Sequence, residues 1–525
     1  MISKAKVVPN NFSLSEMDLA QLEEKQQFQK VSPLKKSELW AWYIQSSTYV
    51  AYGWVGAWLL VPLLIQDMAS KYGVEASNHA IPCNTTAPVI RCVTPLLGMY
   101  IDPGAISLYV SSFSSILSFF TSLSISAVAD HGSYKKSLLI VFSALGCVLT
   151  LGFFTIQTPN LFWIGAILSP LTWTCYNVCG VFSHSFLPIY GHAHSDVLAA
   201  QARGEPLSVV RKIEEQIVND ISAYSAAIAN IGSIIVHGVC IGVSLGMHET
   251  SLSLQIAIAY TGVWWLMWIL IVAPWLDPRP GPPMPKGQNW VTYSWGKTYK
   301  TLLSFKQLPE IFKFMVAWFI LSDGINTMPA IMFIILYREL SFTHVQSLIM
   351  SVLLSVMACL GAYGFMYVRK IWSLTTRFMV ILCLVLYGIQ MAYLVMVPYF
   401  TDQAGLRTMH EGWFHVLYYG IIVSTFYSSC RVMLSELCPP GDENEWFSLY
   451  LLADKGSSWM GPFITGGIFS MTGDYRRAFW FPLVLIIVGV WMLARVDMNK
   501  GKDQAYKFAH AKEARLTSTA EYPLH

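Results

Sequence analysis

The stretch from Ser435 to Pro462 reads SELCPPGDENEWFSLYLLADKGSSWMGP, and it decides how the rest of the chain is interpreted. A Pro-Pro-Gly turn and a run of acidic residues lead into an apolar segment that carries Asp454 and Lys455. In a helix that starts near Glu445, the pair lies about nine residues, or roughly 13 Å, from the start. If this helix spans a bilayer, both charges lie near mid-membrane, where ionisable groups usually serve a pathway, a relay or a buried partner.

The composition is that of a membrane protein. Hydrophobic residues make up 54% of the 525 residues and charged residues only 12%, about half the charged share of soluble domains. Twelve apolar runs are long enough to span a bilayer. We therefore predict an all-α polytopic membrane protein with twelve transmembrane helices, near 42–66, 105–127, 137–157, 161–187, 220–246, 253–275, 310–336, 344–368, 375–397, 413–434, 447–470 and 477–494.

A polar segment divides these spans into two sets of six. It contains DPRPGPPMPKG, which is too rich in proline and glycine for a helix core and indicates an exposed linker. The expected parts are a cytosolic N-terminal tail at 1–41, a six-helix bundle at 42–275, a cytosolic linker at 276–309, a second six-helix bundle at 310–494 and a cytosolic C-terminal tail at 495–525.

The distribution of Lys and Arg predicts the orientation. With a cytosolic N-terminus, 26 of the 34 basic residues fall on the cytosolic side. The loop 67–104 then faces a lumen or the outside, and it contains the sequon Asn84-Thr85-Thr86 between Cys83 and Cys92. We predict a glycan on Asn84; a Cys83–Cys92 disulfide and two free thiols remain equally open.

The sequence offers little for catalysis. It has no glycine-rich loop followed by Lys-Ser/Thr and no hydrolase signature, which argues against direct use of ATP and against an enzyme. The basic residues are scattered between apolar runs, which argues against nucleic-acid binding. His192 and His194 lie in a polar loop without further ligands nearby. We expect no metal and no cofactor.

One loop suggests a transporter superfamily. Between the second and third spans the chain reads SAVADHGSYKK, with Asp130 ahead of Lys135 and Lys136. This resembles the Gly-x-x-x-Asp-Arg-x-Gly-Arg-Arg loop of major facilitator superfamily transporters, in which the aspartate and basic residues tie helix ends together in one conformation. Ser126 and His131 replace the first glycine and the arginine. A basic loop that follows the positive-inside rule is the alternative.

Three longer motifs resemble a more specific family. They are ELWAWYIQSSTYVAYGWVG at Glu38 to Gly56, SDGINT at Ser322 to Thr327, and the opening stretch. Together they are similar to the autophagy-related vacuolar amino-acid effluxers of fungi, a branch of the major facilitator superfamily. The resemblance implies a vacuolar membrane carrier, and the Lys and Arg distribution over an even number of spans predicts that both termini are cytosolic. The resemblance also implies export of amino acids, including leucine, isoleucine and tyrosine, to the cytosol after autophagic breakdown.

Polar residues recur at helical spacing in two spans of the first half. They predict either interhelical hydrogen bonds or the lining of a substrate cavity. The first span carries Gln45, Thr48, Tyr49 and Tyr52, and the fifth carries Asn230, Ser233 and His237. Gly53 and Gly56 would let a neighbouring helix approach the first span closely.

The second half carries the charged candidates. Asp323 lies roughly 20 Å along the seventh span, near Asn326, and Pro329 removes a helical hydrogen bond to Ile325. We predict an interrupted helix there, with Asp323 contacting substrate, or paired with Lys455 or Arg431, or both.

Other charges have separate expectations. Asp454 and Lys455 project about 100° apart and should face different neighbours. Arg431 and Glu436 are expected to form a gating ion pair near the end of the tenth span. Asp130 is the gating residue expected in the first half.

These observations predict a major-facilitator-like carrier that works by alternating access, with the site between two bundles near the midplane. Its partners are an amino-acid substrate and membrane lipids. Proton coupling, through Asp323, His237 or Asp454, and uniport both remain open. The alternatives are an exporter of peptides, drugs or lysolipids on the same fold, and a non-transporting autophagy scaffold.

Overall fold

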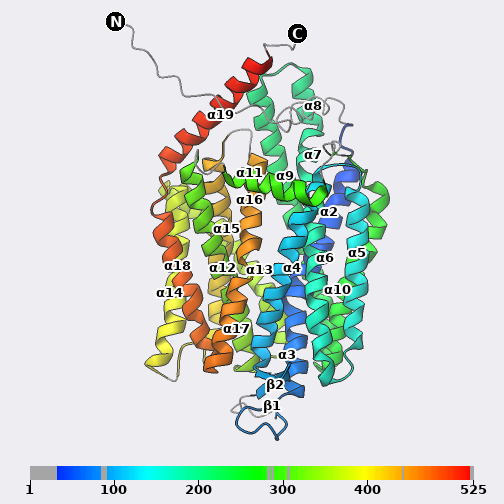
Figure 1. Cartoon of the computed structure of the whole chain (residues 1–525), viewed down its shortest axis with the longest axis vertical. Helices are drawn as coiled ribbons and strands as arrows, with labels where there is room; N and C mark the ends of the chain where they lie inside the picture. Colours follow the sequence, from blue (N-terminus) through cyan, green and yellow to red (C-terminus); the bar gives the residue numbers. More distant parts are fainter. Residues whose placement is uncertain are drawn as a thin grey trace.

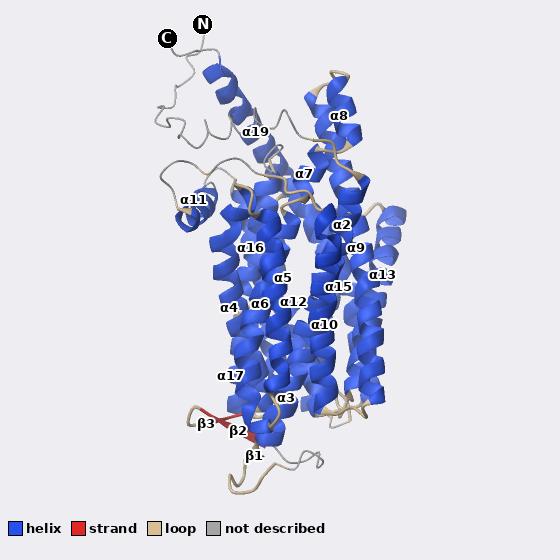
Figure 2. Ribbon diagram, turned by 90° about the vertical axis from the view of Figure 1, so that its right-hand side faces the viewer, coloured by secondary structure: helices blue, strands red, loops and turns tan. Residues whose placement is uncertain are grey.

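The computed structural model describes residues 32–83, 92–280, 284, 289–303, 308–401, 403–439 and 443–520. Long helices run side by side along one axis, which confirms the predicted fold class (Figure 1). We call one end the tail end because it carries α8 (Ser195–Ala202), α11 (Trp290–Leu303) and α19 (Met498–Ala520). The opposite end, which carries three short strands, is the sheet end (Figure 2).

The helices before α11 form the N half. The first span is one rod in three parts, because the π-helix η2 (Tyr52–Leu60) connects α2 (Lys36–Ala51) to α3 (Val61–Tyr72). The other long helices of this half are α4 (Pro103–Asp130), α5 (Lys135–Leu151), α6 (Phe162–His184), α9 (Leu207–Gly246) and α10 (Ser251–Val272). The segment 207–216, where the sequence is polar, continues directly into the fifth span as the start of α9.

The helices after α11 form the C half. Threonine caps begin several of them; in α13, Thr343 and Gln346 form a capping box, as do Thr408 and Glu411 in α15. The long helices are α12 (Pro309–Arg338), α13 (His344–Trp372), α14 (Thr376–Met396), α15 (Met409–Leu437), α16 (Glu443–Ser457), α17 (Met460–Thr472) and α18 (Trp480–Leu493).

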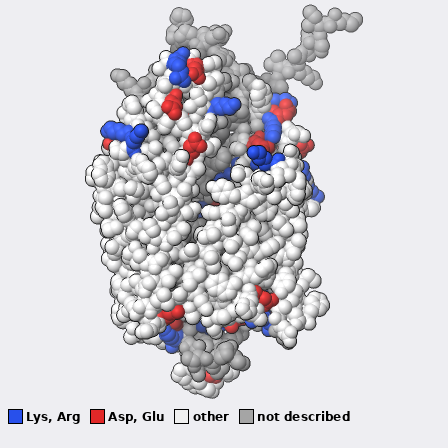
Figure 3. All heavy atoms as spheres, turned by 180° about the vertical axis from the view of Figure 1, so that it is seen from behind, with Lys and Arg blue, Asp and Glu red and all other residues white. Residues whose placement is uncertain are grey.

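Each of the twelve predicted spans overlaps one of these helices. Within the described residues, nine helical segments are long and apolar enough to cross a membrane. The helices α6, α15 and the pair α16–α17 run alongside them (Figure 1). Seen from behind, charged side chains gather at the two ends, and the broad belt between them is almost free of charge (Figure 3). This surface suits a hydrocarbon environment.

The sheet end contains structure that the sequence did not predict. Strands β1 (Val74–Glu75), β2 (Cys92–Leu96) and β3 (Met99–Ile101) form an antiparallel sheet, with Thr94 opposite Ile101. The β2–β3 hairpin turns through Leu97 and Gly98, both with positive φ, as two-residue hairpins require.

A disulfide joins this sheet to the preceding loop. Cys83 is paired with Cys92, at a Cα–Cα distance of 5.7 Å. Thr94 Oγ1 also donates to the carbonyl of Ala69, which anchors β2 to α3. The neighbouring Asn84 lies outside the described residues.

The segments outside the bundles are more ordered than expected. The linker contains α11, which packs on α4 at the tail end, and the C-terminal tail forms α19. Arg279 of the linker makes a buried bidentate pair with Glu38 of α2, both bonds at 2.7 Å. The hydrogen bonds from this pair raise the pKa of Arg279 and fix the linker to the N half.

The two halves meet mainly through α4 against α17 and α9 against α13. Among the described residues, the direct hydrogen bonds between the halves lie towards the sheet end and the middle. Towards the tail end, the surface is hollowed between the halves (Figure 3). The protein is therefore closed at the sheet end and open at the tail end.

Candidate functional site

Asp454 and Lys455 lie together on α16. Asp454 Oδ2 and Lys455 Nζ are 3.8 Å apart, and the side chains are 15% and 47% exposed. The flexible lysine side chain bends back towards the aspartate, yet the two residues have different neighbours: Asn326 of α12 contacts Asp454, and Tyr176 of α6 lies in the field of Lys455. A pair of opposite charges within the span, of which the lysine is exposed and the aspartate partly so, can be reached by a polar solute.

Two residues of the C half position the Asp454 carboxylate. Asn326 of α12 donates from Nδ2 to Asp454 Oδ1 at 3.3 Å. Tyr427 of α15 donates in turn to Asn326 Oδ1 at 2.7 Å, which orients the amide so that its NH₂ group faces Asp454. Three helices therefore converge on this carboxylate.

A helix break lies directly beside the pair, but in the eleventh span rather than the seventh. Helix α16 ends at Ser457 and α17 begins at Met460. Ser458 Oγ donates to the Asp454 carbonyl at 2.6 Å. The Trp459 carbonyl accepts the Phe463 N–H at 3.3 Å and also the hydroxyl of Ser112 of α4 at 2.8 Å, which ties the break to the N half.

The predicted interruption of α12 is wrong, since this helix is continuous from Pro309 to Arg338. The carbonyl of Ile325, which Pro329 deprives of its helical donor, accepts hydrogen bonds from the hydroxyls of Tyr387 at 3.3 Å and Tyr419 at 3.4 Å. Neighbouring tyrosines thus replace the missing bond and keep the helix intact.

Asp323 lies behind the pair and is fully buried. Its Oδ1 accepts the backbone N–H of Gly461 at 3.0 Å, from the first turn of α17. Its Oδ2 has no hydrogen-bond partner among the described residues. Among the described residues, Asp323 forms no ion pair with Lys455 or Arg431. A buried carboxylate with a free oxygen can accept a proton or a cationic group.

Helix α6 supplies the opposite wall of the site. Tyr176 and His184 both interact electrostatically with Lys455, although they belong to the N half. His184 is exposed and Tyr176 partly so. The sequence analysis missed both residues, as it missed Tyr427. Their spacing along one helix face, with Gly180 between them, was the available signal.

The predicted residues of the first span are inside the N half. Gln45 is fully buried and accepts a hydrogen bond from Ser183 at 2.9 Å. Tyr52 is stacked on Trp265 at 5.1 Å, and Tyr49 lies 5.7 Å from the ring of Tyr176. In this conformation, Gln45 and Tyr52 pack helices together, and Tyr49 supports the wall formed by α6.

The glycine prediction is confirmed. A Cβ added to Gly53 would clash with Tyr176 of α6, and one added to Gly56 would clash with Thr261 of α10. Both helices therefore approach the first span at the positions that the sequence indicated.

The predicted residues of the fifth span lie where the two halves meet. His237 is buried, and its Nε2 forms a 3.0 Å hydrogen bond with Ser351 of α13. Its Nδ1 contacts the Ser233 carbonyl at 2.7 Å. Asn230 lies two turns closer to the tail end on the same helix face and is exposed. The interface between α9 and α13 is therefore closed at His237 and open at Asn230.

The expected pair of Arg431 and Glu436 is not present. Glu436 instead pairs with Lys502 of α19 at 2.8 Å and accepts a hydrogen bond from Thr376 at 2.6 Å. Arg431 is exposed and has no ion-pair partner among the described residues. The sequence did not predict that α19 packs here and supplies a closer cation. Asp130 was the gating residue expected in the first half, but its side chain is not among those that the structure describes.

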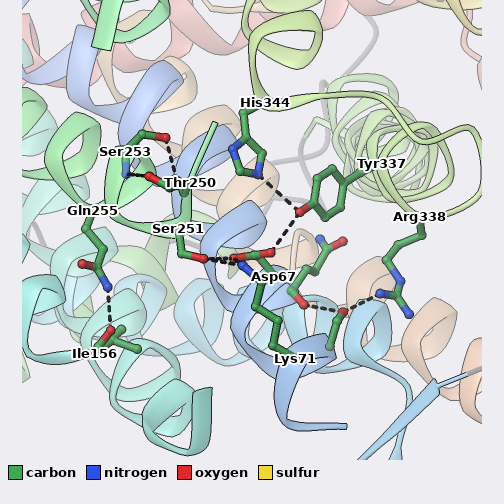
Figure 4. A network of polar contacts seen from close by, with 12 residues as sticks. Asp67, Lys71, Ile156, Thr250, Ser251, Ser253, Gln255, Tyr337, Arg338 and His344 are labelled. Atoms are coloured by element: carbon green, nitrogen blue, oxygen red, sulfur yellow. Dashed lines mark hydrogen bonds and ion pairs between the residues drawn. The ribbon is translucent and has the colours of Figure 1, made fainter. Parts of the chain in front are cut away.

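Polar contacts close the sheet end. We call Asp67, Glu249, Tyr337, Arg338 and His344 the sheet-end network; Figure 4 labels all of them except Glu249. Asp67 of α3 accepts hydrogen bonds from Lys71 at 2.8 Å and from Tyr337 of α12 at 3.5 Å. Arg338 donates to Ser70 of the N half. The His344 backbone N–H donates to Glu249 Oε2 at 2.8 Å.

A further contact reinforces the same end. The Tyr475 hydroxyl donates to Asp102 Oδ1 at 2.6 Å, joining the loop before α18 to the start of α4. The sequence analysis missed this group of contacts, because its members lie at the span ends, where boundaries were uncertain. Asp67 and Lys71, four residues apart at the end of a span, were the available signal.

Comparisons with known proteins agree with this architecture. The family described as "Vacuole effluxer Atg22 like" matches residues 34–506. Autophagy-related protein 22-1 of Emericella nidulans is 28% identical, over 92% of this chain and 94% of that protein. Autophagy-related protein 22 of Gibberella zeae is 26% identical, over 91% and 82%.

Two solved transporters share the fold. A D-xylose-proton symporter is 12% identical with a TM-score of 0.57, covering 89% of this chain and 99% of that one. The peptide transporter POT in complex with sulfate is 12% identical with a TM-score of 0.56, covering 90% and 97%. The extent of the family match shows that the chain belongs to the vacuole effluxer Atg22-like family and is a membrane transporter rather than an enzyme.

Proposed function

We propose that this protein exports neutral amino acids, of the leucine, isoleucine and tyrosine class, from the vacuole to the cytosol. The tail end faces the cytosol and the sheet end the lumen. The clustering of basic residues at the predicted cytosolic positions supports this orientation, as does a disulfide at the sheet end. The family description supports the vacuolar location and the outward direction.

The observation that carries the proposal is the exposed Asp454–Lys455 pair. An amino-acid zwitterion carries an ammonium and a carboxylate close together, and the pair presents one complementary charge to each. Asn326 holds Asp454 in place for the ammonium, while Lys455, 47% exposed and only 3.8 Å from Asp454, can turn to the carboxylate. Charge-assisted hydrogen bonds are the strong ones.

The charge balance of the site supports a neutral cargo. Asp323 and Asp454 contribute two negative charges, and Lys455 and Arg431 contribute two positive ones. Arg431 and Asp454 both act electrostatically on Tyr450, so they share one region. While Asp323 is ionised, a zwitterion leaves this balance unchanged, whereas a cationic or anionic solute would add an unpaired charge, which is costly inside a membrane.

The contrast between a closed sheet end and an open tail end supports transport by alternating access. In the present conformation the sheet-end network joins the halves, and the hollow opens to the tail end, which is the cytosol in our proposal. Rocking of the halves about the central site would break the network and close the hollow. We propose that a proton accompanies the amino acid and that Asp323, with its free Oδ2, carries it.

Efflux from liposomes tests this function. Purified protein is reconstituted with labelled leucine inside, and efflux is followed with and without excess isoleucine, tyrosine, a dipeptide or a lysolipid. We expect leucine efflux that isoleucine and tyrosine inhibit. Inhibition by the dipeptide or lysolipid alone would support a different exporter on this fold. Absence of any flux from folded protein would leave the scaffold alternative, which deletion of residues 1–36 and 500–525 then tests.

A further inference from the structure

His344 occupies a special place in the sheet-end network. It is the first residue of α13 in the C half and is 6% exposed. Its backbone N–H is bonded to Glu249 of the N half, and its ring is stacked on Tyr337, with centroids 5.8 Å apart. Opening of the sheet end would separate His344 from Glu249 and expose the imidazole to solvent on that side.

The hydrogen bonds around His344 suit a neutral imidazole. Nε2 shares a 3.3 Å hydrogen bond with the Tyr337 hydroxyl. Nδ1 is buried and has no hydrogen-bond partner among the described residues. An imidazolium donates from both nitrogens, so a charged ring would leave one buried N–H without an acceptor. That is a costly arrangement away from water.

The charged groups around the ring do not supply the missing acceptor. The carboxylate of Asp67 is bonded to Lys71, Ser251 and Tyr337. Glu249 Oε2 accepts the His344 backbone N–H. The negative charges of Asp67 and Glu249 favour a charged ring and the positive charge of Lys71 opposes it, and Arg338 of α12 is bonded to Ser70. Burial of the ring and the missing acceptor for Nδ1 therefore oppose a second proton on His344 in the closed network, despite the two carboxylates.

We propose that His344 is a proton-binding site that senses the solution at the sheet end and stabilises the open form when protonated. The ring is held neutral in the closed network and gains a proton only when opening hydrates it. Because a ligand that binds one form shifts the population towards that form, acid on this side favours opening. The proposal rests on the proposed function for its orientation and cargo, since it makes an acidic lumen load the carrier.

The size of the effect follows from ordinary histidine chemistry. An exposed imidazole titrates near pH 6.5. Between about pH 7.5 and about pH 5.5, protonation of the open form alone would raise the ratio of open to closed molecules by about tenfold. Histidine is suited to this range, whereas an ordinary carboxylate titrates mostly below it.

Exchange at equal pH on both sides tests the proposal without a proton gradient. Labelled leucine is exchanged against unlabelled leucine at about pH 5.5 and about pH 7.5. We expect wild-type exchange to be several-fold faster at the acidic pH, and His344→Gln to lower this ratio, leaving only the part that protonation of Asp323 supplies. His79→Gln is the matched control, because His79 lies at the same end and stacks on Tyr100 within the N half. It should keep the wild-type ratio.

The outcomes separate this inference from the proposed function. A wild-type ratio near one, or an unchanged ratio in His344→Gln, would overturn the role of His344 while leucine exchange itself stands. No exchange of leucine at either pH would instead overturn the proposed function. If His344→Gln does not fold, Tyr337→Phe serves: it removes the bond to Nε2 and should exchange faster than wild type at the neutral pH. Exchange no faster than wild type would contradict the network's role.

Discussion

At the scale of single residues, Asp323 differs from the other charges of the site because it is buried and has a free oxygen. In Asp323→Asn, the amide oxygen still accepts the Gly461 N–H, but the side chain no longer binds and releases a proton. We expect leucine exchange at equal pH to persist, and the stimulation of efflux by an acidic interior to disappear. Efflux from liposomes with and without a pH gradient measures this.

Asp474→Asn is the control for that experiment, since Asp474 is 41% exposed at the sheet end and pairs only locally with Arg477. It should keep the wild-type response to the gradient. If Asp323→Asn also keeps that response, Asp323 is not the proton carrier.

The residues of the site differ in how far the sequence could predict them. Asp454, Lys455 and Asp323 were identifiable because a charge within an apolar span is rare and costly. The ion pair between Asp454 and Lys455 could not be predicted. Adjacent side chains on a helix diverge unless a long one bends back, and only the packing of the fold decides whether it does. Tyr427 and His184 are ordinary residues in sequence, and their roles depend on helices that lie far apart along the chain.

At the scale of elements, the break between α16 and α17 is the feature that shapes the site. Gly461 sits in its first helical turn, and an added Cβ would clash with Thr327 and lie 2.9 Å from Asp323 Oδ1. We expect Gly461→Ala to destabilise the protein by about 1–3 kcal/mol through overpacking. Thermal unfolding in detergent measures the loss.

A glycine one turn and a half further along provides the control. At Gly467, an added Cβ would meet only the Tyr109 hydroxyl, at 3.9 Å, so Gly467→Ala should melt close to wild type. Equal melting of the two variants would mean that the close approach at the break is not needed for stability.

The helices themselves were largely predictable, because length and hydropathy suffice for a span. The position of the break was not. Pro329 predicted an interruption in α12, but the hydroxyls of Tyr387 and Tyr419 compensate for the lost bond. The actual break, at Ser458 and Trp459, lies ahead of Pro462, which deprives the Ser458 carbonyl of its helical donor just as Pro329 deprives Ile325, so a proline alone does not decide where a helix breaks.

At the scale of the whole molecule, the orientation determines the direction of transport. If the sheet end is lumenal, Asn84 carries a glycan and Asn11 does not, although both lie in sequons. We expect Asn84→Gln to lower the apparent mass of the protein from its native membrane, and Asn11→Gln to leave it unchanged. Gel mobility before and after enzymatic deglycosylation measures both. A shift with Asn11→Gln would reverse the proposed orientation.

The arrangement of the halves is the part of the fold that the sequence could not supply. Hydropathy predicts spans but not which helices meet, so the contacts of His237 with Ser351 and of Asp67 with Tyr337 appear only in three dimensions. These contacts assign the structure to a form closed at the sheet end. The small sheet and α19 were missed because short strands and polar helices leave no hydropathy signal.

The central claim, that the Asp454–Lys455 pair binds an amino acid, is tested most directly by equilibrium binding of labelled leucine to purified protein. We expect saturable binding that isoleucine and tyrosine displace. Loss of one charge-assisted contact costs about 1.5–3 kcal/mol, so Lys455→Gln should bind leucine about ten- to a hundredfold more weakly. Lys313→Gln, at a lysine that is 48% exposed, should bind as wild type does. Wild-type affinity in Lys455→Gln would contradict the assignment of the site.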